Sequence, residues 1–100
     1  SIGIARDHLG LSRISQATGV NIIMGASYYV ADSHPTDMDT WTEEDITAQI
    51  LLDVTEGVDG TDIRSGVIGE IGCSWPLANN ERKVLRASAQ AQTMTGAPLR

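Results

Sequence analysis

The sequence predicts an α/β fold built from crossover units around a parallel sheet. Short, mostly apolar runs occur twice, helical periodicity occurs three times, and the two kinds of segment alternate along the 100 residues. This alternation is typical of parallel sheets, because consecutive parallel strands need a crossover connection that is usually a helix. The expected order is helix, strand, helix, strand, helix.

The first predicted helix begins after Asp7, whose carboxylate can accept hydrogen bonds from the free N–H groups of a first turn. Leu11, Ile14 and Ala17 then lie on one helical face. Gly19 is placed to end the helix, since glycine adopts the left-handed conformation common at helix ends.

The two predicted strands are residues 20–26 and 66–72, separated from the neighbouring helices by glycine and polar residues. Both runs are short, apolar and rich in β-branched side chains, so we expect strands that are buried on both faces. The polar stretch 27–40 predicts a loop between the first strand and the next helix.

The second predicted helix has the clearest start. Thr42 and Asp45 resemble a capping box, and residues 43–45 place negative charge at the positive end of the helix dipole. Gly57 can end this helix, and Asp59-Gly60 predicts a turn. Its apolar stripe comprises Ile46, Ile50, Leu51 and Val54.

The third predicted helix runs to about Thr95, with Asn79 or Asn80 as its cap and with Gly96 and Pro98 closing it. A further strand is expected to begin near Leu99. The side chains available to pack inward are Val84, Leu85, Ala87, Ala91 and Met94.

Two strands do not form a stable parallel sheet alone, because each needs neighbouring strands and a helix layer on both faces. The expectation is therefore that residues 1–100 are an internal fragment of one larger domain.

Composition limits the classes of partner. Seven basic and thirteen acidic residues leave a formal charge of −6, whereas a nucleic-acid binder needs concentrated positive charge. Arg82, Lys83 and Arg86 form the only close basic group, and we expect them on a solvated helix face. No apolar run approaches the roughly 18–20 residues that span a bilayer. We expect no nucleic-acid and no membrane partner, and the oligomeric state stays open.

Cysteine usage bears on compartment and on chemistry. Cys73 is the single cysteine, so no internal disulfide can form, which favours a cytoplasmic location. Two interpretations of Cys73 stay open: a nucleophile, which would need a base nearby, or a small buried apolar side chain, which its surroundings favour.

Glu70 is the residue that most needs an explanation. A carboxylate near the end of an apolar strand costs several kcal/mol to bury as an unpaired ion, and active sites of parallel α/β proteins assemble at the carboxyl ends of strands. Glu70 is either a functional acid, for example a metal ligand, or a strand-end glutamate that simply reaches solvent.

Other polar and aromatic residues give weaker signals. His8 and His34 lack a second ligand at metal-binding spacing, so we expect both on the surface. Tyr28 and Tyr29 follow the first predicted strand, where they line a pocket or, in the favoured interpretation, simply pack.

The run Gly66-Val67-Ile68-Gly69-Glu70-Ile71-Gly72-Cys73-Ser74-Trp75-Pro76-Leu77, followed by Glu81-Arg82-Lys83-Val84-Leu85, closely resembles the phosphotriesterase-related proteins of the amidohydrolase superfamily. The resemblance implies a (β/α)8 TIM barrel, of which this chain is the part around strands three and four with their flanking helices.

The resemblance also implies two divalent metal ions, typically zinc. Glu70 matches the fourth-strand carboxylate that bridges the two metals in this family. No other ligand position falls inside the sequence, and His8 and His34 do not match the ligand histidines.

The implied activity is that of a metal-dependent hydrolase acting on a small-molecule substrate. Its metal centre activates water for attack on an amide or ester bond, and the general base lies outside these residues. N-acyl amino acids such as N-acetyltaurine, lactones and phosphoesters are the implied substrates. The alternative is a non-catalytic α/β binding module in which Glu70 is only a solvated strand-end acid.

Overall fold

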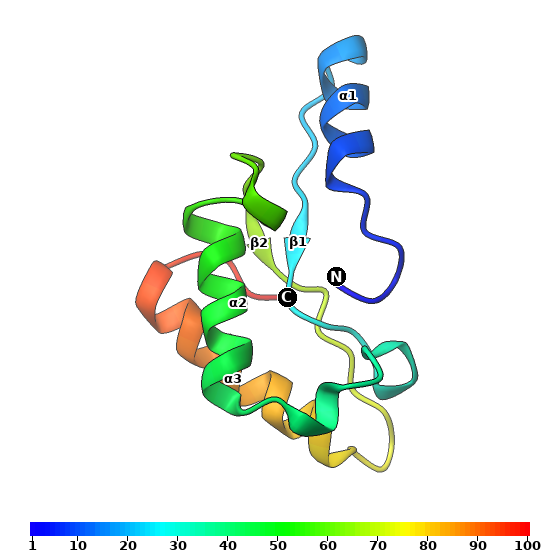
Figure 1. Cartoon of the computed structure of the whole chain (residues 1–100), viewed down its shortest axis with the longest axis vertical. Helices are drawn as coiled ribbons and strands as arrows, with labels where there is room; N and C mark the ends of the chain where they lie inside the picture. The colour runs from blue at the N-terminus through cyan, green and yellow to red at the C-terminus, as the bar shows by residue number, and fades with distance from the viewer.

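Three α-helices and two short parallel strands make up the computed structural model, which describes residues 1–100 (Figure 1). Their order is the one predicted: helix, strand, helix, strand, helix. Single 3-10 turns lie between them, two of them within the stretch 27–40 that we expected to be a loop. The elements are α1 (His8–Thr18), β1 (Gly25–Ala26), α2 (Glu43–Thr55), β2 (Val67–Ile68) and α3 (Asn79–Thr95), and the 3-10 turns are Ala31–Ser33, Met38–Thr40 and Val58–Gly60.

The sheet is parallel, with Gly25 opposite Val67 and Ala26 opposite Ile68. Two single bridges extend it: Ile2 pairs with Tyr28 on one side, and Leu99 pairs with Ile68 on the other, both in parallel orientation. Four extended segments thus lie side by side in chain order. The further strand expected near Leu99 is present as this bridge.

The first predicted strand is shorter and less buried than expected. Val20 is 57% exposed and Ile23 is 74% exposed, and regular pairing begins only at Gly25. The prediction of burial on both faces is wrong for residues 20–23, because the few contacts they make, such as those of Val20 with Ser15 and of Ile23 with Gly66, leave their side chains exposed. An apolar run indicates a surface that can be buried, and whether it is buried depends on the neighbours that pack against it.

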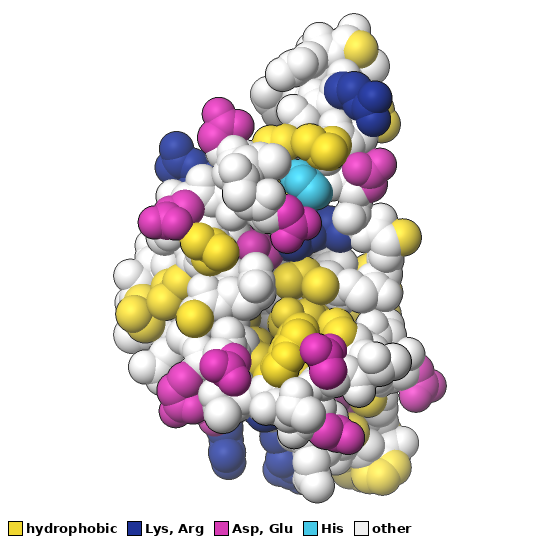
Figure 2. Space-filling model, viewed as in Figure 1, with side chains coloured by type: hydrophobic (Ala, Val, Ile, Leu, Met, Phe, Trp, Pro, Cys, Tyr) yellow, Lys and Arg dark blue, Asp and Glu magenta, His cyan; other side chains and the backbone are white.

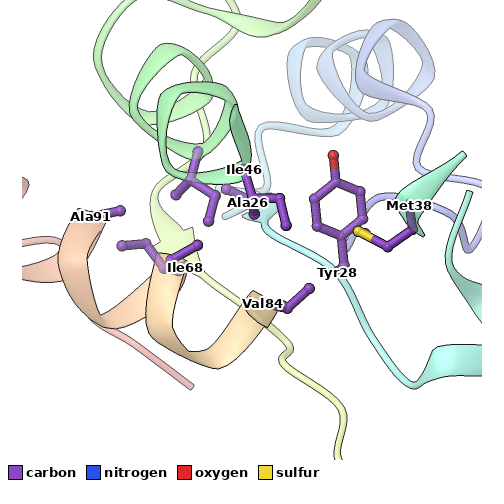
Figure 3. Packing of buried hydrophobic residues seen from close by; sticks show 9 residues of the cluster. Ala26, Tyr28, Met38, Ile46, Ile68, Val84 and Ala91 are labelled. Atoms are coloured by element: carbon purple, nitrogen blue, oxygen red, sulfur yellow. The ribbon is translucent and has the colours of Figure 1, made fainter. Parts of the chain in front are cut away.

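The core lies between the sheet and a layer formed by α2 and α3 (Figure 3). Ile46 and Ile50 reach it from α2 and Val84 from α3. The loop after β1 also contributes, because Tyr28 and Met38 are 1% and 2% exposed. The other members of the cluster are Ala26, Ile68, Ala87 and Ala91. Met94, which we expected to pack inward, is 60% exposed.

The first two helices begin as predicted. The Asp7 carboxylate accepts a hydrogen bond of 3.0 Å from the Gly10 N–H, and Gly19 ends α1 in the left-handed conformation. In α2 both bonds of the capping box are present: Asp45 N–H donates to Thr42 Oγ1 at 3.1 Å, and Thr42 N–H donates to the Asp45 carboxylate at 3.0 Å.

The third helix begins differently. Its cap position is Ala78, not Asn79 or Asn80, and the Ala78 N–H donates at 2.9 Å to the carboxylate of Glu81. Glutamate at the third helical position can serve the start of a helix without an asparagine or serine cap. Gly96 ends the helix as predicted.

The principal extents of the molecule are 41 × 26 × 22 Å, and its two ends differ in how far their helices are buried. Figure 1 shows α1 standing apart from α2 and α3, and no residue of α1 is buried. Figure 2 shows hydrophobic side chains gathered in the middle of the viewed face, with basic side chains scattered around it. None of the helices is long and apolar enough to cross a membrane.

Candidate functional site

The carboxyl edge of the sheet is where sites form in parallel α/β proteins, because the connections that follow the strands meet there. Residues 27–29 leave β1 at this edge, residues 69–71 leave β2, and Arg100 follows the last extended segment. The candidate site is therefore Glu70 together with the two connections that follow the strands.

The main chain around Glu70 is held on several sides. Gly69 N–H donates to Ala26 O at 2.9 Å, Ile71 N–H donates to Arg100 O at 2.9 Å, and Ser1 Oγ donates to Glu70 O at 2.6 Å. Gly69 has a φ of +151°, and a Cβ there would lie 2.5 Å from Arg100 O. Glycine is required at this position, and the base from which Glu70 projects is well defined.

The Glu70 side chain is 58% exposed, and its nearest cation is the mostly exposed Arg100, with Nε 3.9 Å from Oε1. An exposed ion pair at this distance stabilises little, on the order of 0–1 kcal/mol. The carboxylate oxygens are thus accessible to another partner, as a metal ligand requires, and also to solvent, as the simpler interpretation requires.

Glu70 has the chemistry of a metal ligand, but no second candidate ligand lies with it. Carboxylate oxygen suits zinc and other divalent cations. No group of three or more His, Cys, Asp and Glu side chains able to hold a metal occurs in the chain. Residues 1–100 therefore contain no complete metal site of their own, and Glu70 is the accessible carboxylate at this edge.

The histidines do not join Glu70. His34 is half-buried in the connection after β1, where Nε2 lies 2.7 Å from Tyr29 O and Nδ1 is buried without a hydrogen-bond partner. His8 is half-buried in the first turn of α1. Both histidines are therefore less exposed than expected for surface residues, since each side chain is partly covered.

Tyr28 is a packing residue. Its ring centroid lies 5.9 Å from that of Trp41 and 6.2 Å from that of His34. Burial, assisted by the negative charge of Asp53, raises the pKa of the Tyr28 hydroxyl from 10.0 to about 12. Tyr28 packs in the core cluster and also lines a cavity with Trp41, Asp45 and Gln49, so both interpretations of Tyr28 hold, whereas Tyr29 is only half-buried.

Glu81 is a polar residue at this edge that is not among the predicted site residues. It is 0% exposed, and its carboxylate accepts hydrogen bonds from Ala31 N–H at 2.9 Å, from Ser74 Oγ at 2.7 Å and from Ala78 N–H at 2.9 Å. Ser74 N–H also donates to both oxygens, at 3.0 and 3.1 Å. Burial alone would raise the pKa of Glu81, but these donors outweigh it and lower the pKa from 4.5 to about 2.

A signal for Glu81 exists in the sequence. It stands three residues after Ala78, where a glutamate can turn back onto the N-terminus of its helix. The bonds to Ala31 and Ser74 have no such signal, because they join segments that only the fold brings together.

Cys73 is exposed, which corrects the favoured interpretation of a small buried side chain. The residues after it follow the course of a surface loop: Trp75 is 96% exposed, and Ser74 is engaged by Glu81. No histidine is bonded to Cys73 or Ser74 in the way that an activated nucleophile needs.

Lys83 also departs from expectation. Its ammonium donates to Met38 O at 2.7 Å and to Trp41 O at 2.6 Å, so it joins α3 to the turn before α2. Arg82 and Arg86 are exposed, as expected for a solvated face.

The chain is similar to known proteins over nearly its whole length. The family model of the Phosphotriesterase family matches residues 1–100. N-acetyltaurine hydrolase from Xenopus tropicalis is 47% identical over 97 residues, and the phosphotriesterase-related protein from Nematostella vectensis is 50% identical over 97 residues. Each match covers 97% of this chain and 28% of the relative, so the chain spans little more than a quarter of the length of these relatives.

The chain also superposes on solved structures over nearly its whole length. A resiniferatoxin-binding protein from Rhodobacter sphaeroides superposes with a TM-score of 0.93 at 48% identity, covering 97% of this chain and 27% of that one. The phosphotriesterase homology protein from Escherichia coli, solved with phosphate in its active site, superposes with a TM-score of 0.92 at 28% identity, covering 97% of this chain and 34% of that one.

Proposed function

Because this chain belongs to the phosphotriesterase family, we propose that it is the part of a metal-dependent hydrolase that supplies one bridging carboxylate, Glu70. The proposal includes the architecture: a TIM barrel of which the segment at Ile2, β1, β2 and the segment at Leu99 are four consecutive strands. The parallel pairing of these segments in chain order supports this assignment.

The observation that carries the proposal is the placement of Glu70. It follows β2 at the carboxyl edge of the sheet, its main chain is hydrogen-bonded on both sides, and its exposed carboxylate has only a long ion pair of 3.9 Å, with the exposed Arg100. In a (β/α)8 barrel, this edge is the face on which catalytic residues stand.

The chemistry follows from a carboxylate between two cations. Bound divalent metal ions, with zinc as our expectation, would polarise a carbonyl or phosphoryl oxygen and acidify water. Glu70 would hold the metals and balance part of their charge. The hydrogen bonds from Ser1, Gly69 and Ile71 limit the movement of the main chain beneath it.

The substrate class is proposed from the relatives. Several of them are N-acetyltaurine hydrolases, and matched structures include a lactonase and an organophosphorus hydrolase from Deinococcus radiodurans. The identity is 46–50% to the first group and 30% to the second. We therefore place an N-acyl amino acid such as N-acetyltaurine first, before lactones and phosphoesters.

Two observations favour a second function, the binding of a small molecule without catalysis. The structure with 48% identity is described as a resiniferatoxin-binding protein, and the Glu70 side chain is more than half exposed. Both agree with a non-catalytic binding module for a small molecule, in which Glu70 is a solvated acid.

The test uses the complete polypeptide that carries this chain. We expect the purified protein to contain divalent metal and to hydrolyse N-acetyltaurine, and the Glu70→Ala variant to lose metal and activity together. Metal content by mass spectrometry and amine release from the substrate are the two measurements. Glu44→Ala is the matched control, because it removes an exposed acid from the first turn of α2.

Two results would contradict the proposal. Full metal occupancy in Glu70→Ala would remove its role as a ligand. A wild-type protein without metal and without hydrolysis, but with affinity for small apolar ligands, would favour the binding module.

A further inference from the structure

The buried carboxylate of Glu81 does more than begin a helix. A helix start needs its bond to Ala78 N–H, whereas Glu81 also accepts from Ala31 N–H in the connection after β1 and from Ser74 in the connection after β2. One side chain of α3 is thus bonded to both connections that leave the strands at the edge where Glu70 lies.

The two connections also touch directly. A Cβ on Gly72 would lie 2.3 Å from Val30 N and 2.7 Å from Tyr29 C, so the backbones approach more closely than any side chain there would permit. Gly72 sits two residues after Glu70. The Gly72 contact and the Glu81 bonds therefore set the separation of these connections together.

The charge of Glu81 is balanced by N–H and O–H donors alone, because no cationic side chain forms an ion pair with it. Hydrogen bonds to an ionised acceptor are about twice as strong as those between neutral groups. The lowered pKa agrees with a carboxylate that stays ionised near neutral pH. Burying the charge of Glu81 is costly, and the hydrogen bonds that offset this cost come mainly from donors in irregular segments.

We propose that Glu81 is the positioning residue of this site: it fixes the connection carrying Glu70 against the connection after β1, and through them the placement of the Glu70 carboxylate. This inference rests on the proposed hydrolase function. Glu81 touches no reacting atom itself, since it is fully buried beneath both connections.

The test is Glu81→Gln in the complete polypeptide. The amide keeps the size of the side chain, but its NH₂ group faces N–H donors where the carboxylate accepted from them. We expect kcat to fall about 10- to 100-fold, as for other losses of support around a metal site or a small misplacement of reacting groups, with KM nearly unchanged.

Val84→Ala is the matched control. It truncates a 0% exposed side chain one turn further along α3 and removes no bond to either connection. A merely structural role for Glu81 predicts the same kcat per folded molecule in both variants. Positioning predicts that only Glu81→Gln loses kcat.

A second readout does not depend on metal or activity. Amide exchange at Ala31 and Ser74 should become faster in Glu81→Gln and stay unchanged in Val84→Ala. Ser74→Ala, which removes only the hydroxyl bond to Glu81, should show a smaller effect in the same direction and covers the case in which Glu81→Gln does not fold.

The outcomes separate the two proposals. Wild-type kcat in Glu81→Gln, or unchanged exchange at Ala31 and Ser74, overturns the positioning role and leaves the hydrolase function intact. A wild-type protein that has neither metal nor hydrolysis overturns both, whatever the exchange data show.

Discussion

The α2–α3 layer and the N-terminal arm, residues 1–23 with α1, are built from similar sequence patterns but differ in burial. The apolar side chains Ile46, Ile50 and Val84 of the layer are 0% exposed, whereas Ile14 in the arm is 53% exposed and Ile23 is 74% exposed. Amphipathic periodicity specifies which face of a helix can be buried. Whether that face is buried depends on a partner, which the layer has within these residues and α1 lacks.

One polar contact joins the two regions. Arg6, in the arm, donates to Asp53 of α2 at 2.8 Å and to Gly25 O at 3.0 Å, and Gln49 donates to the other Asp53 oxygen at 2.9 Å. The Arg6 side chain is 10% exposed and that of Asp53 is 0% exposed. This buried pair holds the arm against α2 and the beginning of β1, whereas the exposed apolar side chains of the arm do not.

The largest expected effect comes from breaking this pair. Asp53→Ala leaves the Arg6 guanidinium buried without its partner, and removal of one member of a buried ion pair costs about 3–5 kcal/mol. The free energy of unfolding from urea titration, with Asp62→Ala as an exposed acidic control, is the measurement.

The double variant Arg6→Met with Asp53→Leu sharpens the result. It removes both charges, so most of the lost stability should return if the cost arises from an unpaired buried charge. A double variant as unstable as Asp53→Ala would assign the loss to packing or to the Gln49 bond.

The next effect compares the two regions directly. Ile50→Ala in α2 creates a cavity in the core and should cost about 2–5 kcal/mol. In the complete polypeptide that carries these residues, Ile14→Ala in α1 should cost less than about 0.5 kcal/mol if Ile14 is as exposed there as it is within residues 1–100. Thermal unfolding of both variants tests the difference.

The cost of Ile14→Ala reports whether other parts of the complete polypeptide cover α1. If additional barrel elements cover the arm there, Ile14→Ala becomes a core substitution and its cost rises toward that of Ile50→Ala. A cost below about 0.5 kcal/mol would mean that this face of α1 stays in solvent.

Local patterns predicted most of the fold. The order of elements, the caps at Asp7 and Thr42 and the helix ends at Gly19 and Gly96 all follow from interactions within a few residues. Strand lengths did not follow, because pairing depends on neighbours: residues 20–23 have the composition of a strand and no partner in this chain.

The candidate site could be predicted only where a side chain departs from its surroundings. Glu70 stands out as an acid after an apolar strand. Glu81 has a local signal only for its bond to Ala78, because its partner Ala31 lies 50 residues away in sequence and offers only a backbone N–H, which every residue type except proline carries. Asp53 has no such signal for its ion pair, because Arg6 lies 47 residues away. The burial predicted for Cys73 was wrong because the exposure of a loop depends on the course of the whole chain.

The last comparison concerns the two helix caps. Thr42→Ala and Asp7→Ala each remove a side-chain bond at a helix start, a change that typically costs about 1 kcal/mol. The loss in α2 should lower the free energy of global unfolding, because α2 is part of the core. The loss in α1 should appear only as faster amide exchange in the first turn of α1, because a helix without buried residues can fray while the core stays folded. Equal decreases in global stability would show instead that the arm and the α2–α3 layer unfold as one unit, coupled through Arg6 and Asp53.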